Sequence, residues 1–381
     1  MVRFTLPRDL YHGKGSLEAL KTLEGKKAII CVGGGSMKRN GFLQKAEDYL
    51  KEAGMEVKLF EGIESDPSVE TVMKGAAVMT EFEPDWIVAI GGGSPIDAAK
   101  AMWIKYEYPD TTFEDMCKVF GLPKLRKKAH FCAVSSTSGT ATEVTAFSVI
   151  TDYSTGTKYP IADFEITPDV AIVDPELTHT LPKKMVAFTG MDALTHAIEG
   201  YITKNRNTMS QMFSMKAIQL IYDNLDKAVN EKDQEAINNM GLGQYIAGMA
   251  FSNVGLGIVH SMAHQLGAVY DTPHGLANAI LLPTVMKFNG ETSYEEYREI
   301  LTSAFHTDAT KFTKEEVIKT FCEKIKDLSE RVGITQTVGE VGGKIEDIPM
   351  LADKAMEDPC KPGNPREVTK EDFIKLYEEA M

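Results

Sequence analysis

Residues 86–100 read WIVAIGGGSPIDAAK and predict a buried strand, a glycine turn and the start of a helix. The run WIVAI is short, apolar and partly β-branched, as the strands of a parallel sheet are. The three glycines at 91–93 allow a ligand to approach the backbone closely. Pro95 suits a first helical turn, whose free N–H groups and positive dipole end attract phosphate. We therefore expect a pyrophosphate here, although a plain strand-to-helix turn is the alternative. The motif is neither GxGxxG nor a Walker A loop.

Strand and helix patterns alternate through the first half of the chain. The predicted strands are 26–32, 55–60, 85–90 and 130–136, with a last extended segment at 163–177, and the predicted helices include 42–54 and 67–82. This alternation predicts a mainly parallel sheet covered on both faces. From about residue 182 the pattern changes to successive helices, the clearest at 184–204, 208–230, 233–253, 256–270 and 275–289. We predict an α/β dinucleotide-binding domain over residues 1–181 and an all-α domain over residues 182–381.

A second glycine turn, GGGS at residues 33–36, follows the apolar run KAIICV. In dinucleotide-binding folds, an acidic residue at this position often accepts hydrogen bonds from the adenosine ribose. Here the turn offers glycines and a serine hydroxyl, followed by Lys38 and Arg39, which suit a 2′-phosphate. We expect NADP(H) to be favoured over NAD(H), unless these two cations are only solvated surface charges. A third turn, STSGTATE at 136–143, offers hydroxyls for a cofactor, but such clusters are also common as plain turns.

Histidines and one aspartate are spaced as metal ligands in the second half of the chain. Asp192 and His196 are four residues apart, His260 and His264 are four apart, and His274 opens the run HGLANAILLP. Residues four apart lie on one face of a helix, so their side chains can share a cation. One such pair alone is more often a hydrogen-bonded core pair than a ligand pair. Two pairs and a further histidine in apolar surroundings predict a metal site, and three imidazoles with one carboxylate suit Fe²⁺ and Zn²⁺ about equally.

Composition limits the partners of the chain. Among 381 residues, 41 lysines and arginines face 55 aspartates and glutamates, a formal net charge of −14. This balance argues against nucleic acid or an anionic membrane as the main partner. No segment approaches the ~20 apolar residues of a membrane span, and the start, MVRFTLPRDLYHGKG, lacks the apolar core of a secretory signal. The five cysteines include no CxxC pair and predict the reduced thiols of a cytoplasmic protein.

The motifs GGGSPIDAAK, STSGTATEVT, TGTKYPIAD, GMDALTHAIEGY, HSMAHQLGA and HGLANAILLP occur in the order found in iron-containing (group III) alcohol dehydrogenases. The chain resembles this family from about residue 3 to about residue 290, and more loosely beyond. Within the family it is most similar to the clostridial-type NADPH-dependent butanol dehydrogenases and to the alcohol dehydrogenase half of the bifunctional aldehyde–alcohol dehydrogenases. The resemblance implies a two-domain fold with the active site in the cleft between the domains, iron as the metal, and a homodimer.

The resemblance also assigns roles to individual residues. The implied metal ligands are Asp192, His196, His260 and His274. His264 is implied to lie near the substrate and the nicotinamide. The candidate cofactor-binding residues are Gly34, Gly35, Ser36 and Lys38, then Gly91, Gly92, Gly93, Ser94 and Asp97, and finally Thr137, Ser138 and Lys158.

These features predict a metal-dependent alcohol dehydrogenase that interconverts short-chain primary alcohols and aldehydes by hydride transfer with NADP(H). The metal ion, iron with zinc as the alternative, would polarise the substrate oxygen, and His264 would relay the proton. Two alternatives on the same fold are a glycerol-type polyol dehydrogenase and a dehydroquinate synthase-like lyase. A lyase acting on a phosphorylated substrate would need basic side chains near the metal, whereas a small apolar substrate fits the residues around the histidines. These residues are Ser261, Met262, Ala263, Gln265, Leu276 and Ala277. A non-catalytic metal- or nucleotide-binding protein is a third reading, and the combination of phosphate loop and metal residues disfavours it.

Overall fold

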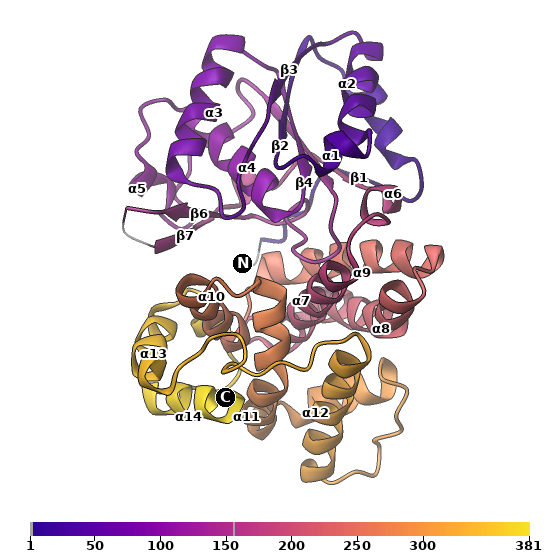
Figure 1. The fold of residues 1–381 in the computed structure, drawn as a ribbon, viewed down its shortest axis with the longest axis vertical. Coiled ribbons are helices and arrows are strands. Elements are labelled where there is room, and N and C mark those ends of the chain that lie inside the picture. Colours follow the sequence, from indigo (N-terminus) through magenta and orange to yellow (C-terminus); the bar gives the residue numbers. More distant parts are fainter. Residues whose placement is uncertain (1–2, 155–156) are drawn as a thin grey trace. The chain divides into compact units, whose positions relative to one another are not determined.

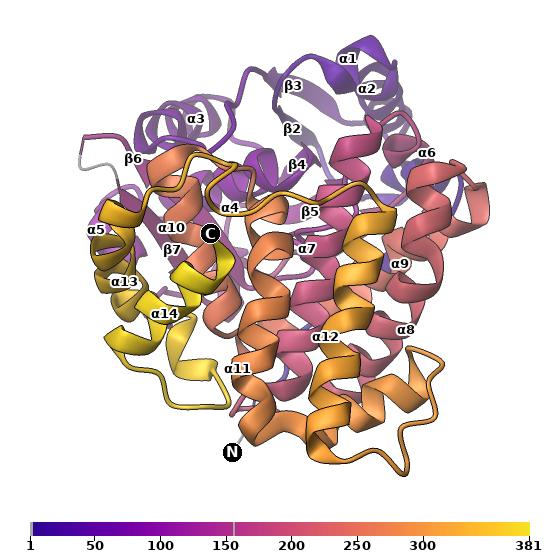
Figure 2. The same ribbon diagram turned by 60° about the horizontal axis from the view of Figure 1, so that its bottom comes forward.

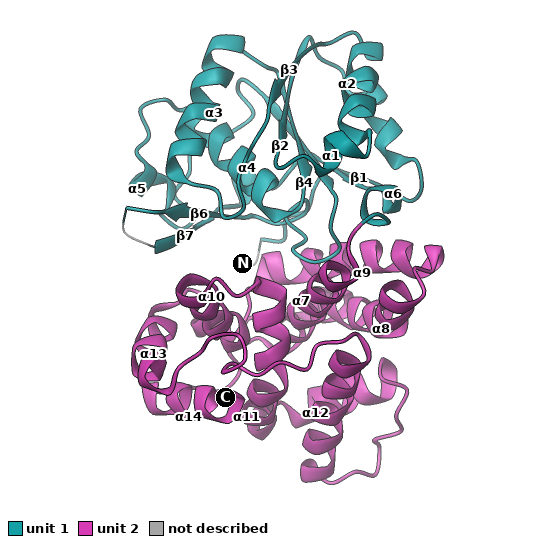
Figure 3. Ribbon diagram, in the orientation of Figure 1, with its two compact units in different colours: residues 1–180 teal, residues 181–381 magenta. Residues whose placement is uncertain are grey.

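The computed structural model describes residues 3–154 and 157–381. The chain divides into two compact units, residues 1–180 and 181–381, shown in teal and magenta in Figure 3. The first unit combines a parallel sheet with helices, and the second is built from helices. The predicted fold class, an α/β dinucleotide-binding domain followed by an all-α domain, is confirmed.

The first unit contains a six-stranded sheet in the order β1-β8-β5-β4-β2-β3, with every pair of neighbours parallel. Its strands are β1 (Asp9–His12), β2 (Lys27–Val32), β3 (Glu56–Phe60), β4 (Trp86–Gly91), β5 (His130–Ser135) and β8 (Val170–Val173). The chain passes from β2 outward to β3 and then returns to β4 on the other side of β2. The crevice at such a reversal is where open α/β sheets bind ligands.

Strand register brings the three predicted turns to the same edge of this sheet. Val32 at the end of β2 is opposite Ile90 of β4, and Gly91 is opposite Ser135 at the end of β5. Because these strands are parallel, the turns that follow them all leave at the carboxyl edge. The structure thus gathers the turns at 33–36, 91–94 and 136–143 beside the reversal of strand order.

Alternate residues of the central strands pack into two apolar layers. Ile87 and Ala89 of β4 belong to the core formed with α3 and α4, and Val88 and Ile90 belong to the core formed with α2 and η1. Figure 1 shows α3 and α4 on one side of the sheet and α2 on the other. The helical segments of this unit are η1 (Ser16–Thr22), α1 (Ser36–Arg39), α2 (Phe42–Glu52), α3 (Val69–Phe82), α4 (Gly93–Glu107), α5 (Phe113–Met116), η2 (Phe164–Ile166) and α6 (Pro175–Thr178). Burial on both faces explains why the strands are continuous apolar runs.

A two-stranded antiparallel hairpin, β6 (Phe147–Asp152) and β7 (Thr157–Ala162), was not predicted from the sequence. It packs against α4, and Thr151 donates its backbone N–H to the carbonyl of Pro67 at 2.8 Å. Polar residues interrupt both strands, which weakens the apolar signal in this stretch. Residues 155 and 156 of the TGTKYPIAD motif lie outside the described residues, and Lys158 lies within them.

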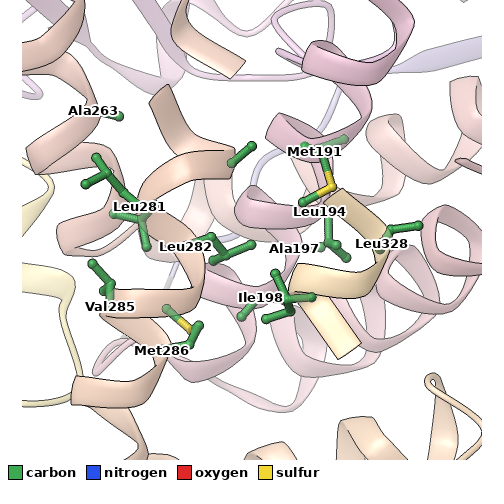
Figure 4. Packing of buried hydrophobic residues seen from close by; sticks show 14 of the residues in the cluster. Met191, Leu194, Ala197, Ile198, Ala263, Leu281, Leu282, Val285, Met286 and Leu328 are labelled. Atoms are coloured by element: carbon green, nitrogen blue, oxygen red, sulfur yellow. The ribbon is translucent and has the colours of Figure 1, made fainter. Parts of the chain in front are cut away.

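The second unit packs its helices around α7. Its elements are α7 (Lys183–Ile202), α8 (Thr208–Asn230), α9 (Gln234–Val254), α10 (Ile258–Tyr270), α11 (His274–Ser303), α12 (Lys314–Arg331), η3 (Ile345–Asp347), α13 (Ile348–Glu357), η4 (Lys361–Gly363) and α14 (Lys370–Ala380). Helix α7 contacts α8, α9 and α11, and α11 runs beside α12 in the turned view of Figure 2. Figure 4 shows the apolar side chains between these helices, including Leu194 and Ile198 of α7 and Leu282 of α11. This packing fixes the helices that carry the histidines.

The sequence predicted the end of one helix wrongly. A helix was expected over 275–289, whereas α11 continues to Ser303 across a kink at Ser293, whose φ is −123°. In the described part of the chain, no helix alone is long and apolar enough to cross a membrane. Helices α9 and α10 satisfy that test only as a pair, across a bend of 103°.

Candidate functional site

Helix α7 carries two of the predicted ligands on one buried face. Asp192 is 2% exposed and His196 is 5% exposed, and Nδ1 of His196 lies 3.9 Å from Oδ2 of Asp192. The His196 ring stacks between Phe251 and His260, at centroid distances of 4.3 and 4.4 Å. An aspartate and an imidazole buried this deeply are favourable only when polar partners or a cation compensate for lost hydration.

The other two predicted ligands come from the first turns of α10 and α11. Nε2 of His260 lies 3.8 Å from Oδ1 of Asp192, and Nε2 of His274 lies 3.4 Å from the same oxygen. One ligand atom from each of these residues and from His196 lies within 4.8 Å of the others. Ligands at bond lengths of 2.0–2.2 Å around a tetrahedral ion are about 3.3–3.6 Å apart. The structure therefore brings together the four residues that the sequence proposed as ligands.

The position of the Asn278 side chain indicates that the proposed ligand atoms could surround a cation. Its Nδ2 lies 2.7 Å from Oδ1 of Asp192, 3.1 Å from Nε2 of His274 and 3.3 Å from Nε2 of His260. Its Oδ1 is buried and has no hydrogen-bond partner among the residues that the structure describes. Three acceptor atoms therefore converge on one electropositive group, which is the arrangement that a divalent cation requires. Three imidazoles and a carboxylate are donors that Fe²⁺ and Zn²⁺ both accept.

Glu199 holds the His260 ring in place from the opposite side. Its Oε2 lies 2.6 Å from Nδ1 of His260, and its Oε1 accepts the backbone N–H of Val259 at 2.8 Å. Burial lowers the pKa of His260 well below the usual value, so the ring is a neutral ligand. With Nδ1–H donated to Glu199, Nε2 is the nitrogen that faces Asp192. Gly257 makes room for this contact, because a Cβ there would lie 2.8 Å from Oε1 of Glu199.

Gly275 allows α11 to approach α7 closely beside the ligands. A Cβ at this position would lie 2.2 Å from the carbonyl oxygen of Phe188 and 3.3 Å from Cβ of Asp192. Any larger residue would push α11 away from α7. His274 supplies a proposed ligand, and the neighbouring Gly275 lets α11 come close enough to α7 for that ligand to reach Asp192.

His264, the predicted proton relay, lies beside this group and is not one of its members. Its Nδ1 lies 2.8 Å from Oδ2 of Asp358, and its ring stacks on His274 at 5.4 Å between centroids. Sequence reasoning missed Asp358, which follows α13 and has no local motif. It also missed Glu199 and Asn278, for which helical spacing offered a signal. Each follows a proposed ligand on the same helix face by three or four residues.

In the first unit, the glycine turns are packed tightly against their neighbours. A Cβ on Gly33 would lie 2.9 Å from Cγ of Pro95, and a Cβ on Gly92 would lie 3.2 Å from Cγ2 of Thr137. Gly93 is similarly close to Thr140. The hydroxyl oxygen of Thr137 is buried and has no partner within the described residues, so it has a free hydrogen-bonding capacity at this edge.

A cavity of about 230 Å³ lies at the glycine turn of residues 33–36. It is lined by Val32, Gly33, Gly34, Gly35, Lys38, Leu43, Glu61 and Gly62. Nζ of Lys38 lies 3.0 Å from Oε1 of Glu61, an acidic residue near this turn that was not predicted from the sequence. Ser36 begins α1 beside the cavity. Lys38 can therefore meet a phosphate here only in competition with Glu61.

The remaining proposed cofactor residues fall into two groups. Ser94 accepts the backbone N–H of Asp66 at 3.3 Å, and Nζ of Lys158 lies 2.7 Å from Oδ1 of Asp66, so Lys158 is held near the 91–94 turn. Asp97, also proposed on the cofactor side, accepts hydrogen bonds with its carboxylate from Thr142 Oγ1 at 2.6 Å and from Val149 N at 3.1 Å. These contacts join α4, which carries Asp97, to Thr142 and to strand β6. Ser138 lies buried in the third turn.

The first unit has glycine turns at a reversal of strand order, and the second unit has a largely buried group of three histidines and one aspartate, as a metal-dependent dehydrogenase requires. The family model for iron-containing alcohol dehydrogenase matches residues 7–175, and the model for the Fe-containing alcohol dehydrogenase family, C-terminal, matches residues 186–381. The chain therefore belongs to the iron-containing alcohol dehydrogenase family, and the predicted resemblance is confirmed.

Similar proteins span the whole chain. The NADPH-dependent butanol dehydrogenase of Clostridium saccharobutylicum is 55% identical, over 99% of this chain and 97% of that protein. The aldehyde-alcohol dehydrogenase of Streptococcus pneumoniae serotype 4 is 37% identical over 98% of this chain, which spans only 45% of that longer protein. A solved structure of a 1,3-propanediol oxidoreductase superposes with a TM-score of 0.94, at 35% identity and with complete coverage of both chains. The predicted enzyme class, alcohol dehydrogenase, is confirmed.

Proposed function

We propose that this alcohol dehydrogenase interconverts short-chain primary alcohols and aldehydes with NADP(H) as the hydride carrier. The convergence of Asp192, His196, His260 and His274 within 4.8 Å carries this proposal. Membership of the iron-containing family favours Fe²⁺ at this centre, with Zn²⁺ as the alternative that the donor set allows. When bound, the cation supplies Lewis-acid stabilisation of the charge that develops on the substrate oxygen.

The residues around the centre are proposed to orient its ligands. Glu199 keeps Nε2 of His260 turned toward Asp192, and Gly275 holds His274 against α7. His264 is proposed to move the proton of the alcohol. Because Asp358 engages Nδ1 of His264, we assign the proton transfer to Nε2. An imidazole is the side chain best suited to exchange a proton near neutral pH.

The first unit is proposed to bind the dinucleotide at the carboxyl edge of its sheet. The N–H groups at the start of α4, with Gly91, Gly92, Gly93 and Ser94, are available for the pyrophosphate, since no side chain caps this helix. Thr137 and Ser138 are proposed to face the nicotinamide side, and Lys158 the ribose. The cavity at Gly34, Gly35 and Lys38, with Ser36 beside it, is proposed to take the 2′-phosphate. The similarity to an NADPH-dependent butanol dehydrogenase supports this cofactor choice.

A polyol dehydrogenase is the second candidate. The structural likeness to a 1,3-propanediol oxidoreductase favours it, because a diol presents a second hydroxyl to the same centre. The lyase alternative is not supported by any of the three relatives described above. The similarity to an NADPH-dependent butanol dehydrogenase favours a mono-alcohol, and the apolar and small residues next to the histidines in the sequence suit a small substrate.

The test is a rate comparison with protein purified without oxygen and loaded with Fe²⁺ or Zn²⁺. Oxidation of NADPH and of NADH is followed with butanal, with glyceraldehyde and with dihydroxyacetone. We expect the largest kcat/KM with butanal and NADPH. A preference for the hydroxylated substrates would select the polyol alternative, and the absence of carbonyl-dependent oxidation of either nucleotide would contradict the proposal.

We further propose a cytoplasmic homodimer. The five cysteines are all unpaired in the structure, which supports a reducing compartment. Light scattering on the purified protein measures the assembly directly, and a monomeric mass would contradict the dimer.

A further inference from the structure

A second group of metal-binding side chains lies in the helical unit, outside the four proposed ligands. His264, Asp358 and Cys360 each offer one ligand atom, and these atoms lie within 4.8 Å of one another. His264 belongs to α10, and the other two residues lie in the loop after α13. We propose that these three residues form a second cation site, which takes a thiophilic divalent cation such as Zn²⁺ or Cd²⁺.

Hydrogen bonds already hold the three side chains together. Nδ1 of His264 lies 2.8 Å from Oδ2 of Asp358, and the backbone N–H of Cys360 donates to Oδ1 of Asp358 at 2.9 Å. The Asp358 side chain is only 7% exposed, whereas that of His264 is 31% exposed. The group is therefore buried on its carboxylate side and open to solvent at the imidazole, which gives a cation a path of entry.

The loop that carries Asp358 and Cys360 is fastened to the helices on both sides of it. Asn289 of α11 and Asn364 exchange two amide hydrogen bonds, at 2.9 and 2.8 Å, and both residues are buried. The hydroxyl of Thr203 donates to the carbonyl of Gly363 at 2.9 Å. Because the loop is held in this way, its two ligands keep their position relative to α10 without a cation.

The donor set decides which cations fit. Zinc bonds of 2.0–2.3 Å place tetrahedral ligands about 3.3–3.8 Å apart, so the contact between His264 and Asp358 has to open by about half an ångström. A thiolate selects Zn²⁺ and Cd²⁺ over Mg²⁺ and Ca²⁺, which prefer oxygen. The thiol proton leaves to solvent when the sulfur–metal bond forms. Three protein ligands leave one position for water.

The second site lies close to the first. The rings of His264 and His274 are stacked with centroids 5.4 Å apart, so a cation on one group repels a cation on the other. We therefore expect the second site to bind more weakly and to fill only when cation is in excess. Excess zinc would then inhibit the enzyme by occupying His264. This last consequence rests on the proposed function, whereas the binding itself does not.

The experiment is a titration of the iron-loaded, full-length protein with Cd²⁺ in the absence of oxygen. The ultraviolet charge-transfer band of a cadmium thiolate reports the sulfur ligand, and elemental analysis after desalting counts iron and cadmium per chain. We expect the band to saturate at one cadmium per chain with iron retained. No band, or cadmium uptake that only replaces iron, would overturn the proposal.

Two variants and a control identify the ligands. Cys360→Ser should abolish the band and weaken cadmium binding more than about 100-fold, because losing a ligand exceeds the 10–100-fold effect of losing its support. Asp358→Asn keeps the thiol and should weaken the same band. This second variant tests the site even if Cys360→Ser fails to fold. Cys117→Ser, a partly exposed cysteine of the first unit, should leave the titration unchanged. A band of full strength in Cys360→Ser would assign it to another thiol and reject the site.

Discussion

The Glu199 carboxylate lies 2.6 Å from Nδ1 of His260, and both side chains are almost completely buried. A histidine that binds metal through one nitrogen commonly donates its other N–H to such a carboxylate. The contact fixes which nitrogen of His260 faces the ligands and increases the basicity of the ring.

Replacing Glu199 should therefore weaken metal binding without removing a ligand. We expect Glu199→Ala to reduce the affinity for Fe²⁺ or Zn²⁺ by about 10–100-fold. Glu199→Gln should fall in between, because one amide oxygen can still accept from His260 while the amide nitrogen opposes the N–H of Val259. Competition with a chelator measures the affinity, and the exposed Glu323→Gln is the control. Equal affinities in all four proteins would show that Glu199 has no role in positioning His260.

Two proposed ligands should differ in their effect on the stability of the metal-free protein. Both His260→Ala and His274→Ala are expected to lose stoichiometric metal. Only His260→Ala should also destabilise the apoprotein, by about 1–3 kcal/mol, because it leaves the buried Glu199 without its partner. The His274 side chain is 41% exposed, so its loss removes little packing. Elemental analysis and denaturant unfolding in chelator measure the two effects, and full metal content in both variants would refute the ligand assignment.

Helix approach at Gly275 should be essential to the metal centre. A methyl group at this position meets the carbonyl of Phe188 at 2.2 Å, so Gly275→Ala should cost about 1–3 kcal/mol and displace His274. Metal affinity should fall together with stability. Gly267→Ala in α10 is the matched control, because its new methyl group would have only an ordinary contact at 3.5 Å. If both variants keep full stability and metal, the close approach is not required.

The cofactor preference can be tested at Gly34. No atom lies within 4 Å of a Cβ built at this position, which lines the cavity beside Lys38. Gly34→Asp should lower the kcat/KM ratio of NADPH to NADH by at least about tenfold, because a carboxylate repels a 2′-phosphate. Gly34→Asn has nearly the same volume without the charge and should change the ratio little. An unchanged ratio in Gly34→Asp would place the adenosine ribose elsewhere.

Thiol reactivity should be low in the native protein. Burial disfavours the thiolate, which raises the pKa of Cys117 to about 11 and the pKa of Cys31 and Cys322 to about 12. The pKa values of Cys132 and Cys360 are raised as well, also chiefly by burial. Since the thiolate is the reactive form, a thiol reagent at pH 8 should modify the native protein slowly and modify five thiols in denaturant. Reaction rates should increase as the pH rises toward these pKa values, and fast native reaction at pH 8 would contradict the burial of the thiols.

The sequence predicted the features that depend on local periodicity. The strands β2, β4 and β5 are apolar on both faces, and Asp192 and His196 have the spacing of one helical turn. Each of these patterns can be recognised within a few consecutive residues. Strand β1 was not predicted, because it has only four residues, half of them exposed, and its partner β8 lies far along the chain. Asp358 was missed for a similar reason. Its contact with His264 joins residues 94 positions apart, and no local pattern reports such a pairing.

The Asn289–Asn364 amide pair ties the loop before α14 to α11, and the backbone N–H of Ile258, at the start of α10, donates to Oδ1 of Asn364 at 3.4 Å. A ribosome that stops between residues 278 and 364 would release a polypeptide with all four proposed ligands of the first site but without this tie. Such a truncated product would carry these four side chains, but α11 would lack its packing against α14. We therefore expect metal loading to require the completed helical unit as well as the histidines themselves.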